Sequence, residues 1–339
     1  MSQDLRLLVQ GLHTRLQHDG RETALVRGVD LRLHAGETLA LVGESGSGKS
    51  LTALTLMRLL ARDARWSWDG QAELVDADGQ HHDLLRLPEA QIRRLRGHQM
   101  AMIFQEPMSC LNPVLTVGQQ IAESVRLHLG LSPAAARQRA LQALEEVEIA
   151  AARQRLDEYP HQLSGGMRQR VMIAMAMVCA PRVLIADEPT TALDVTIAAQ
   201  ILALMRRLQE ANGMAVLFIT HHLGVVAHYA DRVSVMYAGR VVESADVPRL
   251  FAQPSHPYTR GLLECLPGRA RQRALATGQA PVLLDIPGQA PSMQDLPEGC
   301  AFAPRCPQAH ARCGAGEVPW QGAPEHRYRC WLNATEGLA

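Results

Sequence analysis

The sequence has no excess of charge of either sign. Its 339 residues include 34 lysine and arginine residues and 34 aspartate and glutamate residues, so the formal net charge is zero. Proteins that bind nucleic acids or anionic membrane surfaces usually carry a net positive charge. Composition therefore supports neither class of partner. A chain of this length is long for one domain and sufficient for two.

Features of exported and membrane-spanning proteins are also missing. The segment Met1–Arg6 lacks the basic start and the long apolar core of a signal peptide. The longest strongly apolar run, Val171–Ala180, is shorter than the roughly 20 residues that a membrane-spanning helix needs. We therefore expect a cytosolic protein that does not cross a bilayer unaided. No internal repeat is visible, which argues against two fused copies of one domain.

The segment Gly43–Ser50, GESGSGKS, fits the pattern of a phosphate-binding loop. The apolar run Thr38–Val42 predicts a buried strand before it, and helical spacing of apolar residues predicts a helix over Leu51–Leu60. The glycines let the backbone curl around an anion, and the helix N-terminus adds positive potential. We expect Lys49 to neutralise the β- and γ-phosphates of a nucleotide and Ser50 to bind Mg²⁺. The predicted nucleotide-binding residues of this loop are Gly43, Glu44, Ser45, Gly46, Ser47, Gly48, Lys49, Ser50 and Leu51.

The hydrophobic pattern predicts an α/β fold. Residues 5–42 favour antiparallel strands, and residues 66–87 favour a hairpin with turns at Asp69-Gly70 and Asp78-Gly79. Strands alternating with helices imply a mainly parallel sheet whose site lies at the carboxyl ends of its strands. Beyond Glu243, recurrent prolines predict a loop-rich appendage without long helices. Further predicted elements are strands at 100–104, 183–186, 214–220 and 232–237 and helices at 115–129, 132–149, 168–179 and 197–211.

Four polar residues each follow a predicted buried strand. We expect Asp187 to hold Mg²⁺ through water and Glu188 to polarise an attacking water. Gln105 offers an amide to Mg²⁺ or to the water, and His221 is expected to contact the γ-phosphate. Taken singly, a strand-end aspartate or histidine is more often a turn residue. Together with the phosphate loop, the four favour one nucleotide-hydrolysing site.

These motifs resemble the nucleotide-binding subunits of ABC transporters. The resemblance includes the signature Leu163–Arg170, LSGGMRQR, and the segment Ala192–Asp194. It implies a P-loop NTPase of the ABC type, with a RecA-like core, an antiparallel β subdomain and a helical subdomain at about 109–175. It also implies that two such domains close head to tail around two ATP molecules. Ser164, Gly165 and Gly166 would then bind the ATP that the partner subunit's phosphate loop holds.

The C-terminal part resembles the extension of oligopeptide/dipeptide importer ATPases. The resemblance rests on His256–Leu263, HPYTRGLL, on Ile286–Gly288 and on the cysteines that follow. It implies an ABC domain at 1–250 and an extension at 251–339. Met167 in the signature is similar to the D-type subunit of these systems. The implied partners are an F-type ATPase, two transmembrane permeases and a periplasmic or extracellular solute-binding protein, with no nucleic acid. The implied location is peripheral, on the cytoplasmic face of the inner membrane.

Four of the seven cysteines lie in the last forty residues, spaced Cys300-x5-Cys306-x6-Cys313-x16-Cys330. Reduced thiols in a cytosolic chain suit zinc or an iron–sulfur cluster. Structural zinc sites usually have tighter spacings. The family resemblance implies a 4Fe–4S cluster, and zinc stays the alternative. We expect the metal centre to have a structural role, since a small proline-rich tail cannot build a hydrophobic core and needs a cross-link. The other cysteines are expected to be buried apolar residues, namely Cys110, Cys179 and Cys265.

Two positions depart from the family pattern. Leu16 stands where an aromatic residue usually stacks on adenine, and His13 or His18 are the candidates to replace it. His222 stands where an aspartate is common.

The resemblance implies an ATP-hydrolysing motor that drives import of peptides or related small solutes, with permease helices seated near Glu106–Pro113. The alternatives are a soluble ABC ATPase acting on ribosomes or DNA, and a tail that senses redox state or metal.

Overall fold

The computed structural model describes residues 4–61, 64–106, 110–191 and 193–333. The chain forms two compact units, each built from separate segments. Unit 1 comprises Met1–Leu8, Arg32–Glu37 and Glu73–Phe218, and unit 2 comprises Val9–Leu31, Thr38–Ala72 and Ile219–Ala339. In the part of the chain that the structure describes, no helix is both long and apolar enough to span a membrane.

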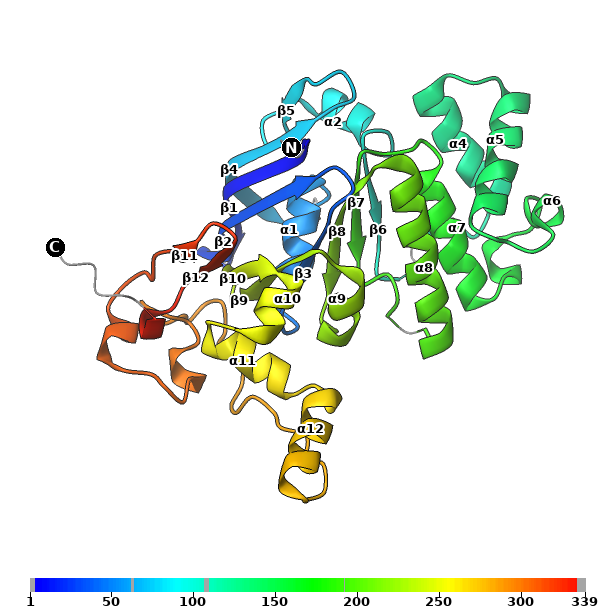
Figure 1. The fold of residues 1–339 in the computed structure, drawn as a ribbon. Coiled ribbons are helices and arrows are strands. Elements are labelled where there is room, and N and C mark those ends of the chain that lie inside the picture. Colours follow the sequence, from blue (N-terminus) through cyan, green and yellow to red (C-terminus); the bar gives the residue numbers. More distant parts are fainter. Residues whose placement is uncertain (1–3, 62–63, 107–109, 192, 334–339) are drawn as a thin grey trace. The chain divides into compact units, whose positions relative to one another are not determined.

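Unit 1 contains parallel strands that are buried along their length. Strand β6 (Met100–Ile103) pairs with β7 (Val183–Asp187), with Met100 opposite Val183 and Ile103 opposite Ala186. Most of β8 (Ala215–Thr220) also belongs to this unit and neighbours β7 (Figure 1). Strands covered on both faces read as continuous apolar runs, which is why the sequence predicts them well. These three predictions are confirmed.

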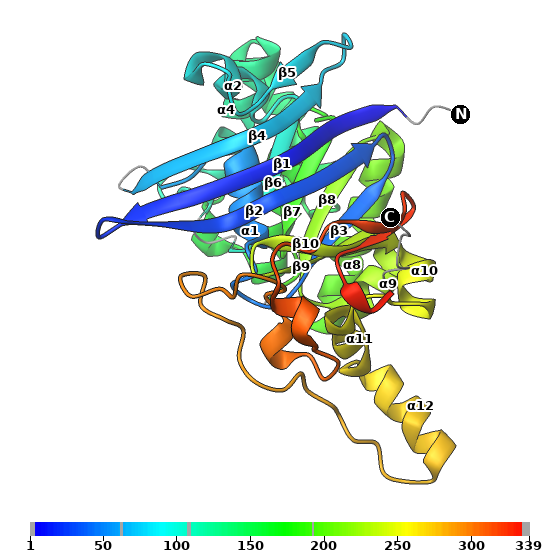
Figure 2. The same cartoon turned by 90° about the vertical axis from the view of Figure 1, so that its left-hand side faces the viewer.

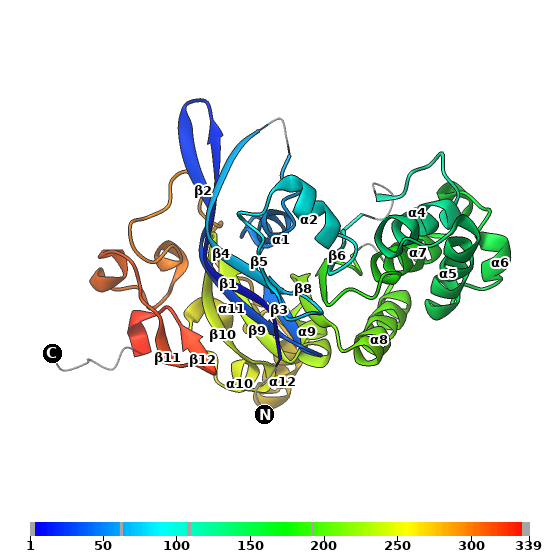
Figure 3. The same cartoon turned by 90° about the horizontal axis from the view of Figure 1, so that it is seen from above.

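The helices α4 (Val117–Leu129), α5 (Pro133–Glu146) and α7 (Gly165–Met177) of unit 1 pack against one another (Figure 3). Thr116 begins α4 with a capping box to Gln119, and Ser132 caps α5. Both helices were predicted. Among the described residues, the other helices of unit 1 are α2 (Glu89–Leu95), α6 (Ala152–Arg155), η1 (Pro160–Gln162) and α8 (Val195–Asn212).

One predicted turn is wrong. Asp69-Gly70 lies inside β4 (Arg65–Val75), not in a turn. Gly70 has φ 108°, and a Cβ atom there would lie 2.5 Å from the carbonyl oxygen of Gly11 on β1 (Leu5–His18). Glycine is therefore required by the close approach of another strand. In unit 2, β2 (Arg21–His34), β1 and β4 run side by side (Figure 2).

The other predicted turn of the hairpin is confirmed. The Gly79 N–H donates to the carbonyl oxygen of Asp76 at 3.1 Å, and the Asp76 carboxylate accepts from the N–H groups of Asp78 and Gln80. After this turn, β5 (His81–Asp83) pairs antiparallel with the end of β4.

Within unit 2, a run of paired strands joins the segment before the phosphate loop to the C-terminal extension. Strand β3 (Thr38–Val42) pairs parallel with β9 (Arg232–Tyr237), which pairs antiparallel with β10 (Arg240–Asp246). The short strand β12 (His326–Tyr328) pairs with β10, and β11 (Gln321–Ala323) pairs with β12. The extension thus covers what would be an open edge of β10.

The prolines after Glu243 start helices as well as loops. Pro248, Pro257 and Pro267 each stand in the first or second position of a helix, where their missing N–H costs nothing. The helices are α10 (Val247–Ala252), α11 (Pro257–Glu264) and α12 (Pro267–Thr277). The predicted loop-rich character is therefore wrong up to residue 277 and holds beyond it, where short η2 (Ala303–Arg305), η3 (Ala311–Gly314) and η4 (Trp331–Asn333) interrupt irregular chain. In the described part of unit 2, the other helices are α1 (Lys49–Leu56) and α9 (Leu223–Tyr229).

A fully buried carboxylate ties the extension to β10. The Glu243 side chain accepts hydrogen bonds from the N–H groups of Ser255 at 2.7 Å and His256 at 2.9 Å. Its Oε1 also lies 2.7 Å from Nε2 of His326 on β12. A buried carboxylate is stable only when its lone pairs are used in this way.

We expect Glu243→Ala to lower the free energy of unfolding by about 3 kcal/mol, because it leaves buried donors from three residues unpaired. Denaturant unfolding of the full chain measures the change. The control is Glu325→Ala, which removes an exposed ion pair with Arg249 and should cost under about 1 kcal/mol. Equal costs in the two variants would contradict a structural role for Glu243.

Candidate nucleotide-binding site

The phosphate loop of unit 2 lies between β3 and α1, as predicted. A Cβ atom on Gly43 would lie 2.1 Å from the carbonyl oxygen of Met236, so only glycine fits there. Gly46 and Gly48 have φ of 76° and 101°, a region that glycine adopts without strain. The loop is held from outside by a hydrogen bond from the Gly239 N–H to the Ser47 carbonyl oxygen at 2.9 Å.

The Lys49 ammonium lies inside the curl of this loop. It donates to the carbonyl oxygens of Gly43 and Glu44, each at 2.9 Å, and the side chain is buried. The Ser47 hydroxyl is also buried and has no hydrogen-bond partner among the described residues. An ammonium and an unpaired hydroxyl at a helix N-terminus fit a phosphate ligand. The helix ends at Leu56, earlier than predicted.

Unit 1 brings together two of the predicted catalytic residues. Gln105 Nε2 donates to Glu188 Oε2 at 3.1 Å, from the segments that follow the paired strands β6 and β7. The Thr191 hydroxyl donates to the same oxygen at 2.8 Å. Glu188 has φ 47°, a strained conformation for a non-glycine residue that is often found at functional sites. Asp187 is the buried last residue of β7.

The signature forms the start of α7. Ser164 caps this helix by accepting from the Met167 N–H at 3.3 Å, and Gly165 and Gly166 are its first two residues. The helix therefore begins three residues before the predicted Arg168. Ser164 and Gly165 are exposed, and a Cβ atom on Gly165 would meet no heavy atom within 4 Å. An open helix N-terminus of this kind can accept an anion brought by another molecule.

A side chain that sequence reasoning missed supports the signature helix. Gln169 is buried on α7, and its amide Nε2 donates to the carbonyl oxygen of Pro189. This contact connects the signature helix to the segment that directly follows Glu188. Glutamine inside a helix gives no local signal for such a role.

His221 follows β8 directly and lies in unit 2 with the phosphate loop. Its ring centroid is 4.2 Å from that of His222, and both residues are exposed. Gln105, Asp187, Glu188 and the signature belong to unit 1. The meeting of all these groups around one nucleotide stays a prediction. Pro107 and Ala192, which belong to the motifs of the family resemblance, lie outside the described residues.

The candidates for contact with adenine lie on β1. Leu16 is half-buried, and the exposed His18 stands at the end of the strand. His13 Nδ1 lies 2.9 Å from the Gly11 carbonyl oxygen and 3.3 Å from the Asp69 carboxylate. Contact between any of these side chains and the adenine base stays a prediction.

The loop has two further contacts, which the sequence did not reveal. The Glu44 N–H donates to the Tyr258 hydroxyl oxygen at 2.9 Å, and Arg305 Nη1 donates to the Glu44 carboxylate at 2.9 Å. Burial raises the pKa of Tyr258 well above its ordinary value, so its hydroxyl stays neutral. The partners are 214 and 261 residues from Glu44 in sequence, and no local pattern announces them.

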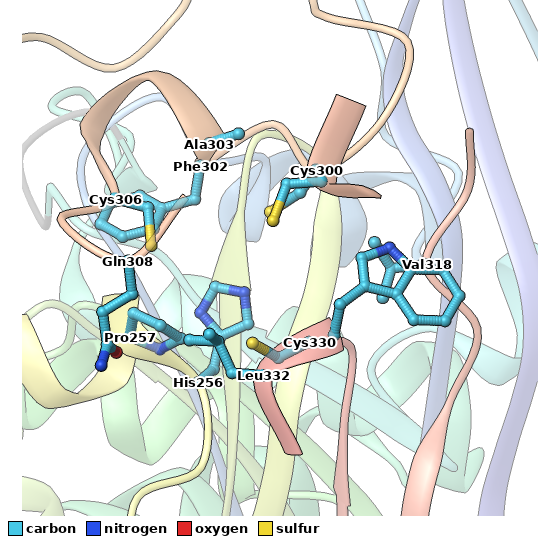
Figure 4. Close-up of a pocket in the computed structure, with 12 residues that line it drawn as sticks. His256, Pro257, Cys300, Phe302, Ala303, Cys306, Gln308, Val318, Cys330 and Leu332 are labelled. Atoms are coloured by element: carbon cyan, nitrogen blue, oxygen red, sulfur yellow. The ribbon is translucent and has the colours of Figure 1, made fainter. Parts of the chain in front are cut away.

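The four C-terminal cysteines line one hollow of about 310 Å³, which includes space open to solvent. Figure 4 shows the sulfur atoms of Cys300, Cys306 and Cys330 around this hollow, beside His256. The N–H of Cys300 donates to the carbonyl oxygen of Cys313 at 2.8 Å, which brings two of the cysteines together. All four are free thiols. Among the described residues, no three histidine, cysteine or acidic side chains form a ligand set for a metal ion.

Burial raises the pKa values of the Cys300 and Cys306 thiols and raises that of Cys330 to about 11. A metal centre bound here must displace these thiol protons.

Of the three other cysteines, Cys179 is buried as predicted. Cys110 and Cys265 are only half-buried, so the prediction for them is wrong.

Comparison with known proteins identifies two regions. The family described as ABC transporter matches residues 26–191, and the oligopeptide/dipeptide transporter C-terminal region matches residues 242–313. A Brucella abortus protein named as a peptide import ATP-binding protein is 51% identical over 96% of both chains. The oligopeptide transport ATP-binding protein AppD of Bacillus subtilis is 47% identical over 98% of both chains. The glutathione import ATP-binding protein GsiA of Salmonella typhimurium is 56% identical over 77% of this chain and 42% of its own length.

Solved structures confirm the predicted fold. A dimeric ATP-binding cassette, MJ0796, in a post-hydrolysis state with ADP and Pi is 26% identical, with a TM-score of 0.61 over 71% of this chain and 98% of its own. The cbiO1 protein of Clostridium perfringens, part of an ABC transporter complex, has the same identity and TM-score over 81% of this chain and 96% of its own. From the motifs, the fold and these relatives, the chain belongs to the ABC transporter family of ATP-binding proteins, in the group with the oligopeptide/dipeptide transporter C-terminal region.

Proposed function

We propose that this chain is the ATP-hydrolysing motor subunit of an ABC importer for peptides or related small solutes. The observation that carries the proposal is the combination in one chain of a built phosphate loop and an exposed signature helix N-terminus. Peptide import and oligopeptide transport in the names of relatives that match nearly the whole chain support the substrate class.

The residues divide the chemistry of ATP hydrolysis among them. Lys49 and the loop would hold the β- and γ-phosphates, and Ser50, Gln105 and Asp187 would hold Mg²⁺, which would neutralise phosphate charge when bound. Glu188, oriented by Gln105 and Thr191, takes the proton of the attacking water. His221 contacts the γ-phosphate. Hydrolysis in this scheme depends on positioning and charge stabilisation more than on covalent chemistry.

Each site is completed by a second ATPase. Ser164, Gly165 and Gly166 bind the ATP held by the partner subunit, because an exposed helix N-terminus offers N–H donors to an incoming anion. The dimeric cassette among the solved relatives supports this arrangement. We propose an F-type ATPase as the partner in a heterodimer, with ATP closing the pair and hydrolysis reopening it.

We expect Glu188→Gln to reduce ATP turnover by about 10²–10⁴-fold, because the amide keeps the size of the side chain but accepts no proton. The variant should accumulate as an ATP-bound closed dimer, measured by size-exclusion chromatography with MgATP. Glu210→Gln, on the exposed face of α8, is the matched control and should hydrolyse ATP normally. Normal hydrolysis by Glu188→Gln would refute the role given to Glu188.

The motor requires membrane partners. We propose two permeases, a periplasmic or extracellular solute-binding protein and a peripheral position on the cytoplasmic face of the inner membrane. Permease helices would seat near Glu106–Pro113, of which residues 107–109 lie outside the described part. Purification of the tagged chain from detergent-solubilised cells should recover permeases and a second ATPase, identified by mass spectrometry. Recovery of ribosomes or DNA instead would support a soluble ABC ATPase.

We propose a structural 4Fe–4S cluster at Cys300, Cys306, Cys313 and Cys330, with zinc as the alternative. Support comes from four free thiols that line one hollow. In the described part of the extension, the three-residue strand β12 pairs with β10, and β11 pairs with β12. A tail with so little regular structure gains stability from a bound metal centre.

Replacing one ligand tests this site. We expect Cys330→Ser to lose the bound metal and several degrees of thermal stability, because a structural centre contributes to folding. Metal and sulfide analysis of anaerobically purified protein measures the loss and distinguishes iron from zinc. Cys265→Ser, outside the hollow, is the matched control. Unchanged metal content in Cys330→Ser would rule out the site.

A further inference from the structure

Glu44, the second residue of the phosphate loop, is held at three of its polar groups. Its N–H donates to the Tyr258 hydroxyl, its Oε2 accepts from Arg305 Nη1, and its carbonyl oxygen accepts from Lys49 Nζ, each at 2.9 Å. Two of these three partners belong to the C-terminal extension. All four residues belong to unit 2.

Arg305 is rigid because its guanidinium is bonded on every nitrogen. Besides Glu44, it donates from Nε to the Pro287 carbonyl oxygen at 2.9 Å and from Nη2 to the Ile286 carbonyl oxygen at 3.2 Å. Its Nη1 also lies 3.3 Å from the Tyr237 hydroxyl. The side chain is only 6% exposed. A buried guanidinium with hydrogen bonds on all three nitrogens is held in one geometry, so it holds the Glu44 carboxylate at a defined place.

An aromatic cluster supports both contacts. The ring centroids of Tyr237 and Tyr258 are 4.6 Å apart, and each lies 5.3 Å from that of Phe302. Tyr258 is fully buried, and the Arg305 guanidinium lies 5.9 Å from the Tyr237 and Phe302 centroids. Tyr237 ends β9 directly after Met236, whose carbonyl oxygen packs against Gly43. The loop is therefore contacted by β9 at Gly43 and by the extension at Glu44.

Holding the loop in advance affects binding. A phosphate loop binds through main-chain N–H groups whose directions must agree, and a loop already held in that shape loses less entropy when the ligand arrives. An unheld loop would also let the Glu44 carboxylate move toward the phosphates and repel them. Both effects weaken nucleotide binding without touching the catalytic groups of unit 1.

We infer that Arg305 and Tyr258 of the C-terminal extension are positioning residues for the phosphate loop, acting through Glu44 to set nucleotide affinity. The extension is then part of the nucleotide site as well as a metal-binding tail. This inference rests on the proposed function, since it requires that the loop binds ATP.

The test measures the affinity of the full-length chain for MgATP and the KM and kcat of the assembled ATPase. We expect Arg305→Met and Tyr258→Phe each to weaken binding about tenfold, seen mainly as a rise in KM. Arg305→Lys should recover part of the loss, because the positive charge remains. Arg249→Met is the matched control, since Arg249 forms an ion pair with Glu325 of the extension rather than with Glu44. It should bind as the parent chain does.

A double-mutant cycle separates loop positioning from general destabilisation. If Arg305 acts through Glu44, the variant carrying both Arg305→Met and Glu44→Gln should bind no more weakly than the weaker of the two single variants. Additive losses would overturn the inference. Tyr258→Phe removes only a hydroxyl group. If Arg305→Met does not fold, the affinity of Tyr258→Phe for MgATP still tests the inference.

A chemical readout is available because Lys49 is the only lysine in the sequence. An amine-reactive reagent therefore modifies only Lys49 and the N-terminal amine, and mass spectrometry follows each. We expect Arg305→Met and Tyr258→Phe to raise the labelling rate of Lys49 several-fold, with MgATP protecting it. Unchanged labelling together with unchanged affinity would overturn the inference.

Lys49→Ala distinguishes failure of this inference from failure of the proposed function. It removes the ammonium that faces the phosphates and should abolish measurable binding. If Lys49→Ala loses binding while Arg305→Met and Tyr258→Phe keep it, only the role of the extension is wrong. If Lys49→Ala itself retains full affinity, the loop is not the nucleotide site, and the inference is overturned together with the proposed function.

Discussion

The architecture depends on a tight curl of backbone between β3 and α1. Main-chain N–H groups can face one anion only where the chain turns sharply, and Gly43 permits the turn because it has no Cβ atom to meet the Met236 carbonyl. The parallel pairing of β3 with β9 brings Met236 to that place. The loop is therefore shaped by a neighbouring strand as well as by its own glycines.

The extension is integrated into unit 2 by buried polar contacts. Its strand β12 pairs with β10, and Glu243 on β10 bonds the chain at Ser255 and His256 as well as His326. His256 Nδ1 accepts from the Tyr258 N–H at 3.1 Å and so caps the helix that presents the Tyr258 hydroxyl to the loop. Burial lowers the pKa of His256 to about 3, which keeps the imidazole neutral and able to accept. One chain of contacts thus leads from the sheet to the phosphate loop.

The strained backbone at Glu188 is also held in place by side chains from neighbouring segments. A left-handed glutamate directly after a buried strand costs free energy, and the hydrogen bonds from Gln105 and Thr191 hold it. The signature helix is connected to the same region through Gln169 and Pro189. Movement of α7 would therefore also affect the segment next to Glu188.

Much of the framework follows from local pattern. The buried strands β3, β6, β7 and β9 are short and mostly apolar, and α4 and α5 carry their own caps, so their positions could be predicted to within a few residues. The phosphate loop and the signature are contiguous motifs whose chemistry depends on residues next to one another. The extension was predicted less well, because prolines that start helices resemble prolines that break them and because β11 and β12 are only three residues long.

The sequence by itself determined the class of chemistry, since glycines, a lysine and a serine at fixed spacing suffice to specify a phosphate site. Only the tertiary structure decided what surrounds that site. It turned Gly70 from an apparent turn residue into a point of close strand approach, and it brought Tyr258 and Arg305 onto Glu44. Contacts between residues more than 200 positions apart leave no periodicity or spacing in the chain. They arise only when separate segments are packed together.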